Sequence, residues 1–174
     1  FLAESPVKEV KVDRGEKKLP QILSSREIEL LLDYMFDSDN YTTYPLLEES
    51  ILLAVPGQFA VNEQLAEFRL SAEDVRNGRH LEEDCPRITL DAFQNEPFLQ
   101  LKKGNDMHDR SLAIYSALQF TPQQVFHLDQ LMTCYHAVEA GMGISFITDT
   151  LPKAISAADG IAYYRLDTEH THRT

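Results

Sequence analysis

Histidine and cysteine are the residue types best suited to catalysis or metal binding, and the sequence contains six histidines and two cysteines. His108, His127 and His136 lack the spacing of metal-binding motifs such as His-Glu-x-x-His. Cys134 and His136 lie two positions apart on a predicted helix, so they point away from each other. The sequence also lacks a Gly-x-Ser-x-Gly elbow, a Walker loop and a Gly-x-Gly-x-x-Gly fingerprint. We therefore expect no catalytic residues, no metal site, no cofactor and no enzymatic activity.

Two polar segments are better suited to ligand binding. Gly104-Asn105-Asp106 follows a predicted strand and precedes a predicted helix, where backbone N–H groups bind a carboxylate or another anion. Capping of that helix by Asp106 or Asp109 explains the same pattern equally well. The second segment is the end of the predicted strand at 29–34, because strand ends in open α/β sheets face ligand crevices. Tyr34 there either contacts a ligand or packs in the core.

Short apolar runs between turn residues predict the strands that position these segments. We expect strands at 7–12, 28–32, 51–55, 98–101, 125–128, 144–147 and, as the last strand, 161–166. Helical patterns over short connections separate several of these strands. This alternation is typical of an α/β fold built around mostly parallel sheets.

Three helices carry clear boundary or face signals. Ser71 and Asp74 have the spacing of a capping box, and Asn77-Gly78 ends that short helix. The second helix places Leu112, Tyr115 and Leu118 on one face, which makes it a candidate for an intersubunit interface. The third helix is expected to start with Asp129 as its cap and to end at Gly141. Its apolar residues are Leu131, Tyr135 and Val138.

Composition and charge exclude several classes of partner. Sixteen Lys and Arg against 28 Asp and Glu give a formal net charge of −12. Such a chain is repelled by a phosphate backbone, so we expect no binding to DNA or to an anionic membrane by this chain alone. Apolar runs are only a few residues long, which excludes a membrane span. The first residue is Phe1 and Thr174 ends a polar run, so we expect a piece of a longer protein.

Several segments, taken in order, resemble the effector-binding (substrate-binding) domain of LysR-type transcriptional regulators. The most specific is Ala137-Val138-Glu139-Ala140-Gly141-Met142-Gly143-Ile144-Ser145-Phe146, which is similar to the family's valine, two residues, Gly-x-Gly-Ile block before a strand. The other matching pieces are 45–56, 96–99 with Gly104 and Arg110, 120–122 and, upstream, 5–12 with Gly15, and 28–32.

The resemblance implies a two-lobed α/β fold like that of the type 2 periplasmic binding proteins, here partly truncated at both ends. Residues 1–46 would form part of the first lobe (lobe I), 47–168 the second lobe (lobe II), and 169–174 the return crossing toward lobe I. The helix-turn-helix domain that binds DNA in the family would lie outside this chain.

The resemblance also implies an effector site in the cleft between the lobes. Carried over position by position, it comprises three clusters at strand ends. They are Asp33 and Tyr34, then Gln100, Asn105 and Asp106, then His127 and Asp129. A carboxylate or an amino acid is the expected class of effector.

The expected function is therefore the sensing of a small metabolite by a bacterial, cytoplasmic transcription regulator. The parent protein would act as a homodimer or homotetramer, would bind DNA only through its missing N-terminal domain, and would have no membrane partner. The alternatives are an extracytoplasmic solute-binding protein of the same fold and an enzyme built on it.

Overall fold

The computed structural model describes residues 47–155 and 160–173. The chain divides into two compact units, Phe1–Tyr44 and Pro45–Thr174, and the described residues all belong to the second. The strands expected at 7–12 and 28–32, the two candidate site residues Asp33 and Tyr34, and the first lobe as a whole lie outside the described residues.

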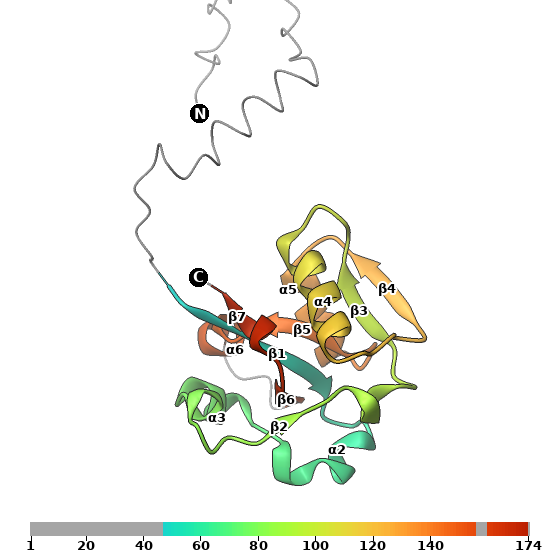
Figure 1. Ribbon diagram of the computed structural model, residues 1–174. Helices are drawn as coiled ribbons and strands as arrows, with labels where there is room; N and C mark the ends of the chain where they lie inside the picture. Colours follow the sequence, from blue (N-terminus) through green and yellow to red (C-terminus); the bar gives the residue numbers. More distant parts are fainter. Residues whose placement is uncertain (1–46, 156–159, 174) are drawn as a thin grey trace, which may run out of the picture. The chain divides into compact units, whose positions relative to one another are not determined.

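The larger of two sheets is built around the buried strand β1 (Glu49–Pro56). β5 (Ser145–Thr148) and β6 (Ile161–Leu166) flank β1, and both run antiparallel to it. The short strand β7 (His172–Arg173) pairs with the beginning of β1, also antiparallel, and β2 (Arg87–Ile88) runs parallel to β6. Figure 1 shows β1 crossing the middle of this layer.

The smaller sheet consists of β3 (Phe98–Leu101) and β4 (Val125–Leu128), which are parallel. A parallel bridge between Phe98 and Ile144 connects β3 to the start of β5. The carboxyl ends of β3, β4 and β5 therefore point to the same edge. Because β5 is antiparallel to β1, the first residues of β1 also lie at that edge.

The expectation of mostly parallel sheets is wrong for the layer around β1. Three of the four strand pairs in that sheet are antiparallel. A fully buried run such as Ile51–Val55 is typical of a strand covered on both faces, but it carries no information about the direction of its neighbours. The expectation that 161–166 is the last strand is also wrong, since β7 follows it.

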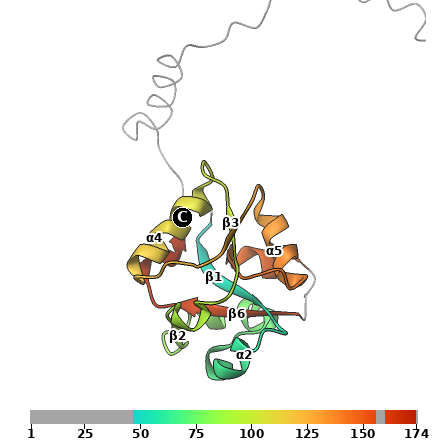
Figure 2. The same cartoon turned by 90° about the vertical axis from the view of Figure 1, so that its right-hand side faces the viewer.

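Helices cover both sides of the sheets. The longer ones are α4 (Asp106–Ala117) and α5 (Leu131–Glu139), which lie on opposite sides of β3 in Figure 2. The shorter helical elements are α2 (Val61–Gln64), η3 (Ala66–Phe68), α3 (Ala72–Arg76), η4 (Arg79–Leu81), η5 (Asp91–Phe93), α6 (Thr150–Ala154) and η6 (Glu169–Thr171). In the part of the chain that the structure describes, no helix is both long enough and apolar enough to cross a membrane.

Two helix boundaries confirm the local sequence signals. The Ser71 hydroxyl accepts a hydrogen bond from the backbone N–H of Asp74, and the Asp74 carboxylate accepts one from the Ser71 N–H. This is the reciprocal capping box that the spacing predicts. After α5, Gly141 has a φ of +80°, a conformation that a glycine adopts without steric penalty.

Two other helix predictions are wrong. Asp129 does not cap α5, because the N-cap is Gln130, which makes no side-chain cap hydrogen bond. Leu112 is 49% exposed although Tyr115 is buried, so the two do not share a buried face of α4. The buried positions of α4 follow a helical stripe, and Leu112 lies about 100° around the helix from its neighbour Ser111 on that stripe. The stripe comprises Met107, Ser111, Ile114 and Tyr115.

The core between these layers is rich in aromatic side chains. Phe98 packs against Tyr115, Phe120 and Phe146 with ring centroids 5.4–6.2 Å apart. Burial raises the pKa of the Tyr115 hydroxyl well above its usual range. β3 and α4 are thus fixed to β5 by one cluster, which gives the end of β3 a rigid support.

Candidate functional site

The candidate site lies where β3 ends and α4 begins. In the register of the parallel pair, Gln100 is the partner of His127 and Leu101 is the partner of Leu128. The backbone N–H of Lys102 donates to the carbonyl of Leu128 at 3.0 Å, which extends the pairing one residue further. The carboxyl end of β5 lies at the same edge of the sheet. Ligands often bind where the carboxyl ends of parallel strands meet.

Gln100 is the most informative of the predicted site residues. Its side chain is 6% exposed, and its Nε2 group has no hydrogen-bond partner among the described residues. A buried amide donor without a partner destabilises a protein by about 1–3 kcal/mol, so such groups are rare and call for a physical explanation. A ligand oxygen that accepts from Nε2 would supply one.

Asn105 has a clear structural role at the start of α4. Its side-chain oxygen accepts a hydrogen bond from the N–H of Met107 at 3.0 Å. The turn before it contains Gly104 with a φ of +95°, in the region that favours glycine. The sequence left Asp106 and Asp109 as possible caps, but the structure assigns the cap to Asn105. Because the cap already satisfies one N–H of the first turn, fewer donors remain there for an anion.

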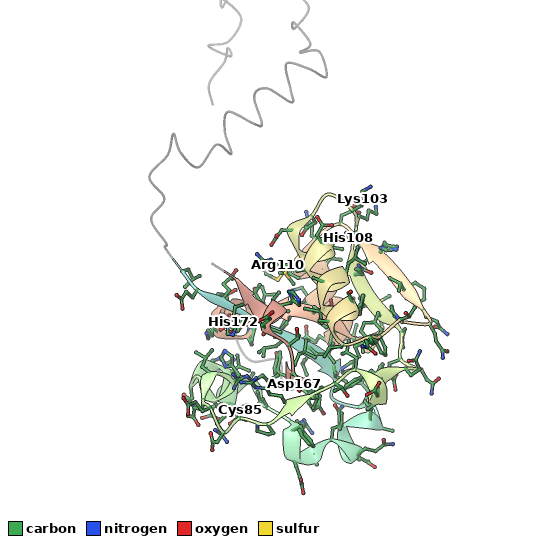
Figure 3. The ribbon with its side chains drawn as sticks, in the orientation of Figure 1. Cys85, Lys103, His108, Arg110, Asp167 and His172 are labelled. Carbon is green, nitrogen blue, oxygen red and sulfur yellow. The ribbon has the colours of Figure 1, made fainter. Side chains whose placement is uncertain are left out.

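Asp106 faces along the helix toward its C-terminal end. Its Oδ2 accepts a hydrogen bond from Nε of Arg110 at 2.8 Å. The same guanidinium donates through Nη1 to the backbone carbonyl of His172 at 3.1 Å. Figure 3 shows Arg110 on α4 next to His172 on β7. The beginning of α4 is therefore connected through Arg110 to the strand that pairs with the start of β1.

His127 and Asp129 lie at and just after the end of β4. The side chain of His127 is exposed. Asp129 is 75% exposed and its Oδ1 lies 2.8 Å from Nζ of Lys102. This ion pair bridges the ends of β3 and β4, and at such exposure it contributes little to stability. The structure thus brings Gln100, Lys102, His127 and Asp129 to one edge.

The sequence analysis missed a buried ionic cluster next to this edge. Nε2 of His80 lies 2.9 Å from Oδ2 of Asp149, and both side chains are almost inaccessible. Oδ1 of Asp149 accepts from the backbone N–H of Ser50 at 2.9 Å, and Lys153 also pairs with Asp149. Burial alone would raise the pKa of Asp149, but the hydrogen bonds from His80, Lys153 and Ser50 outweigh it and hold the pKa at about 2. No local motif marks this pair, since its members are 69 positions apart.

This cluster is built for structure and not for catalysis. A His–Asp pair serves catalysis when it orients a base toward a nucleophile that a substrate can reach. His80 and Asp149 are both buried, and Asp149 holds the backbone at the start of β1. Within 47–155 and 160–173, no group of three or more His, Cys, Asp or Glu side chains could hold a metal ion.

Comparisons with known proteins agree on one class. The chain is 27% identical over 149 residues to an uncharacterised HTH-type transcriptional regulator, YcgK, of Bacillus subtilis (strain 168). The match covers 83% of this chain and 44% of that protein, so the chain spans less than half the length of this relative.

Two solved structures show the same fold at low identity. The regulatory domain of CcmR from Synechocystis PCC6803, in complex with 2-PG, matches with a TM-score of 0.52 and 14% identity over 71% of this chain and 50% of that one. The reduced form of the OxyR regulatory domain from Pseudomonas aeruginosa matches with a TM-score of 0.50 and 17% identity over 76% and 53%. These likenesses confirm the predicted α/β class with a fold of the type 2 periplasmic-binding-protein kind.

The family itself is established by the sequence of the whole chain. The family model described as LysR substrate binding domain matches residues 1–174. This match includes the segments on which the resemblance was based, from 45–56 to the Gly-x-Gly-Ile block at 141–144. The chain belongs to the LysR substrate-binding-domain family.

Proposed function

We propose that this chain senses a small-molecule effector for a longer LysR-type transcription regulator, and that Gln100 contacts the effector. The observation that carries the assignment of the site is the buried Nε2 of Gln100, which has no partner among the described residues. It lies in β3, one residue before the strand ends, at an edge that also carries charged and polar side chains. A carboxylate oxygen is the acceptor best suited to this donor, because hydrogen bonds to charged groups are the stronger ones.

The charges around Gln100 favour an effector that carries both signs. Asp106 pairs with Arg110 and Asp129 pairs with Lys102, so the edge carries both carboxylates and cations. An amino acid presents a carboxylate to Gln100 and an ammonium group to the carboxylates. The proposed set of contacts is completed by Asn105 and His127. It also includes Asp33 and Tyr34, which lie outside the described residues.

A thermal-shift screen of the 174-residue chain tests the proposal. The compounds are amino acids, small carboxylates and aromatic acids, each followed by calorimetric titration where the melting temperature rises. Since a ligand that binds the native state alone stabilises it by mass action, we expect one chemical class to raise the melting temperature in a saturable way. The absence of any saturable shift across these classes would contradict the site.

We propose that the parent binds DNA through a domain outside this chain and is a homodimer or homotetramer. The −12 charge opposes DNA binding by this chain, and a two-fold protein pair matches a near-palindromic site. The exposed Leu112 on α4 is a candidate contact. Gel shifts of the chain alone and of the full-length protein test the first part, and light scattering of the full-length protein tests the second.

The alternatives differ in what they require. An extracytoplasmic solute-binding protein would need export, whereas a regulator acts on DNA in the cytoplasm, where we place the parent. The relative described as an HTH-type transcriptional regulator supports the regulator over the solute-binding protein. An enzyme on this fold would need an accessible acid, base or nucleophile, and the buried His80–Asp149 pair does not offer one.

A further inference from the structure

Two arginines lie side by side on β2 and β6, which β1 and β5 separate from the strand that carries Gln100. Arg87 on β2 and Arg165 on β6 are register partners in a parallel pair. Their side chains therefore leave the same face of the sheet, from strands about 4.8 Å apart. Like charges in this position repel each other, so an arrangement of this kind needs compensation from nearby acceptors.

The protein compensates these two cations only in part. One nitrogen of Arg165, Nη1, donates to the carbonyl of Glu82 at 2.6 Å. Among the residues that the structure describes, Arg87 has one ionic partner, Asp167, at 3.8 Å, and the Asp167 side chain is 62% exposed. That separation is too long for a hydrogen bond, and exposed pairs of this kind contribute little. Each guanidinium has five N–H groups, so most of these donors have no partner within 47–155 and 160–173.

Both arginines line one cavity of about 350 Å³, together with Thr171 and His172. This volume is within the range of small-molecule sites. Asp167 and His172, which are labelled in Figure 3, also line it. Asp167 and Glu169 also line the cavity and oppose an anion there, but the Asp167 side chain is largely exposed, so solvent screens its charge.

A buried histidine extends this cavity. A smaller cavity of about 40 Å³ shares Arg165, Thr171 and His172 with the larger one and is also lined by His80. His80 is 2% exposed, and its Nδ1 has no partner among the described residues. Because Nε2 already bonds to Asp149, Nδ1 is left for one water molecule, which a cavity of this size can hold.

We propose that this cavity is a second ligand site, which binds a small oxyanion through Arg87 and Arg165, with the smaller cavity lined by His80 beside it. A phosphate or a carboxylate matches the forked geometry of two guanidinium groups. The site shares no residue with the proposed effector contacts around Gln100, so it goes beyond the function proposed above.

Occupation of this site would act on the segment between β6 and β7. Asp167, Thr168, Glu169 and Thr171 all belong to that segment and line the cavity. His172, which follows, pairs with Ser50 at the start of β1. A bound anion would tie this connection to β2 through Arg87. It would stabilise the native chain by an amount that rises with the logarithm of the anion concentration above the Kd.

Titration of the 174-residue chain with inorganic phosphate, and separately with malonate, tests the site by NMR and calorimetry. We expect saturable shifts of the Arg87 and Arg165 side-chain N–H signals and of the His80 ring nitrogens, with the two anions distinguishing a phosphate from a carboxylate ligand. Arg87→Gln and Arg165→Gln should each weaken binding about tenfold or more. The matched control is Arg69→Gln, which removes an exposed charge outside the cavity.

The variants distinguish a site from general attraction to positive charge. Arg165→Gln removes the hydrogen bond to Glu82, so a loss of folding in that variant is a separate effect. Arg87 makes only an exposed contact, and Arg87→Gln therefore carries the test. Equal weakening by Arg69→Gln, unchanged affinity in Arg87→Gln, or the absence of saturation with both anions would each overturn the proposal.

Discussion

Replacing Gln100 by methionine should stabilise the domain and at the same time weaken effector binding. Methionine has nearly the shape of glutamine but no donor, and the Nε2 that it eliminates is buried without a partner among the described residues. Removing an unpaired buried polar group contributes about 1 kcal/mol to the free energy of unfolding. For a unit of this size that corresponds to a melting temperature roughly 3–5 °C higher. In the complex, the lost hydrogen bond to a charged acceptor should weaken affinity about tenfold or more.

The opposite signs of the two effects make this test sharp. Differential scanning calorimetry of the unliganded variant gives the first, and calorimetric titration with the effector found in the screen gives the second. Gln64→Met is the matched control. Gln64 is exposed and lies on α2, which comes after the end of β1 opposite the candidate site. It should change neither quantity. A lower melting temperature for Gln100→Met would show that the amide stabilises the apo domain, and an unchanged affinity would remove Gln100 from the site.

Three further outcomes follow from particular contacts. Asn105→Ala should lower the free energy of unfolding by about 1 kcal/mol in urea denaturation, whereas Asn105→Asp keeps the cap of α4 and should not. Asp149 has a folded pKa of about 2, below its ordinary 3.8, so its stabilisation of about 2 kcal/mol is present at neutral pH and is lost as the pH falls from about 4 to about 2. An acid-unfolding curve that Asp149→Asn leaves unchanged would refute this. Gly143→Ala would place a Cβ 2.6 Å from the carbonyl oxygen of Pro97 and should destabilise the domain by about 2 kcal/mol in thermal unfolding; a neutral result would show that this backbone contact gives way.

Features encoded by neighbouring residues could be predicted from the sequence. The capping box at Ser71 and Asp74 and the glycine after α5 depend on residues within a few positions of one another. The strands at 98–101, 125–128 and 161–166 have the predicted bounds because apolar runs and turn residues define them locally. The family could be recognised for the same reason, since its motifs are short and their order is fixed.

Features that depend on distant partners could not be predicted. His80 and Asp149 are 69 positions apart, and Arg110 reaches a carbonyl 62 positions away. The direction of β5 and β6 relative to β1 is another such feature, because alternation and burial are the same for parallel and antiparallel neighbours of a fully buried strand. Asp129 was expected to cap a helix on spacing alone, but its carboxylate is engaged by Lys102.

For the candidate site, the sequence predicts which segments to test but not the contacts that their side chains make. The family resemblance placed Gln100 and Asn105 in one cluster of the expected site, and in the structure Gln100 lies in β3 and Asn105 caps the helix that follows it. Their environments differ: one has a buried donor without a partner, and the other uses its oxygen to cap a helix. These environments depend on how β3, β4 and α4 pack. The sequence therefore predicts which segments to test, and only the packing separates a ligand donor from a helix cap.

The strand pair formed by Ser50 and His172 connects both proposed sites to the rest of the chain. Ser50 is held through its N–H by Asp149, and the carbonyl of His172 is held by Arg110. Arg110 is in turn bonded to Asp106 at the start of α4. A ligand at the Gln100 edge that shifts α4 therefore acts on β7 through one guanidinium, and an anion in the arginine cavity acts on the segment that leads into β7. The two influences meet at one cross-strand pair, so we expect the sites to be coupled, and linkage requires that each ligand change the affinity for the other by the same factor.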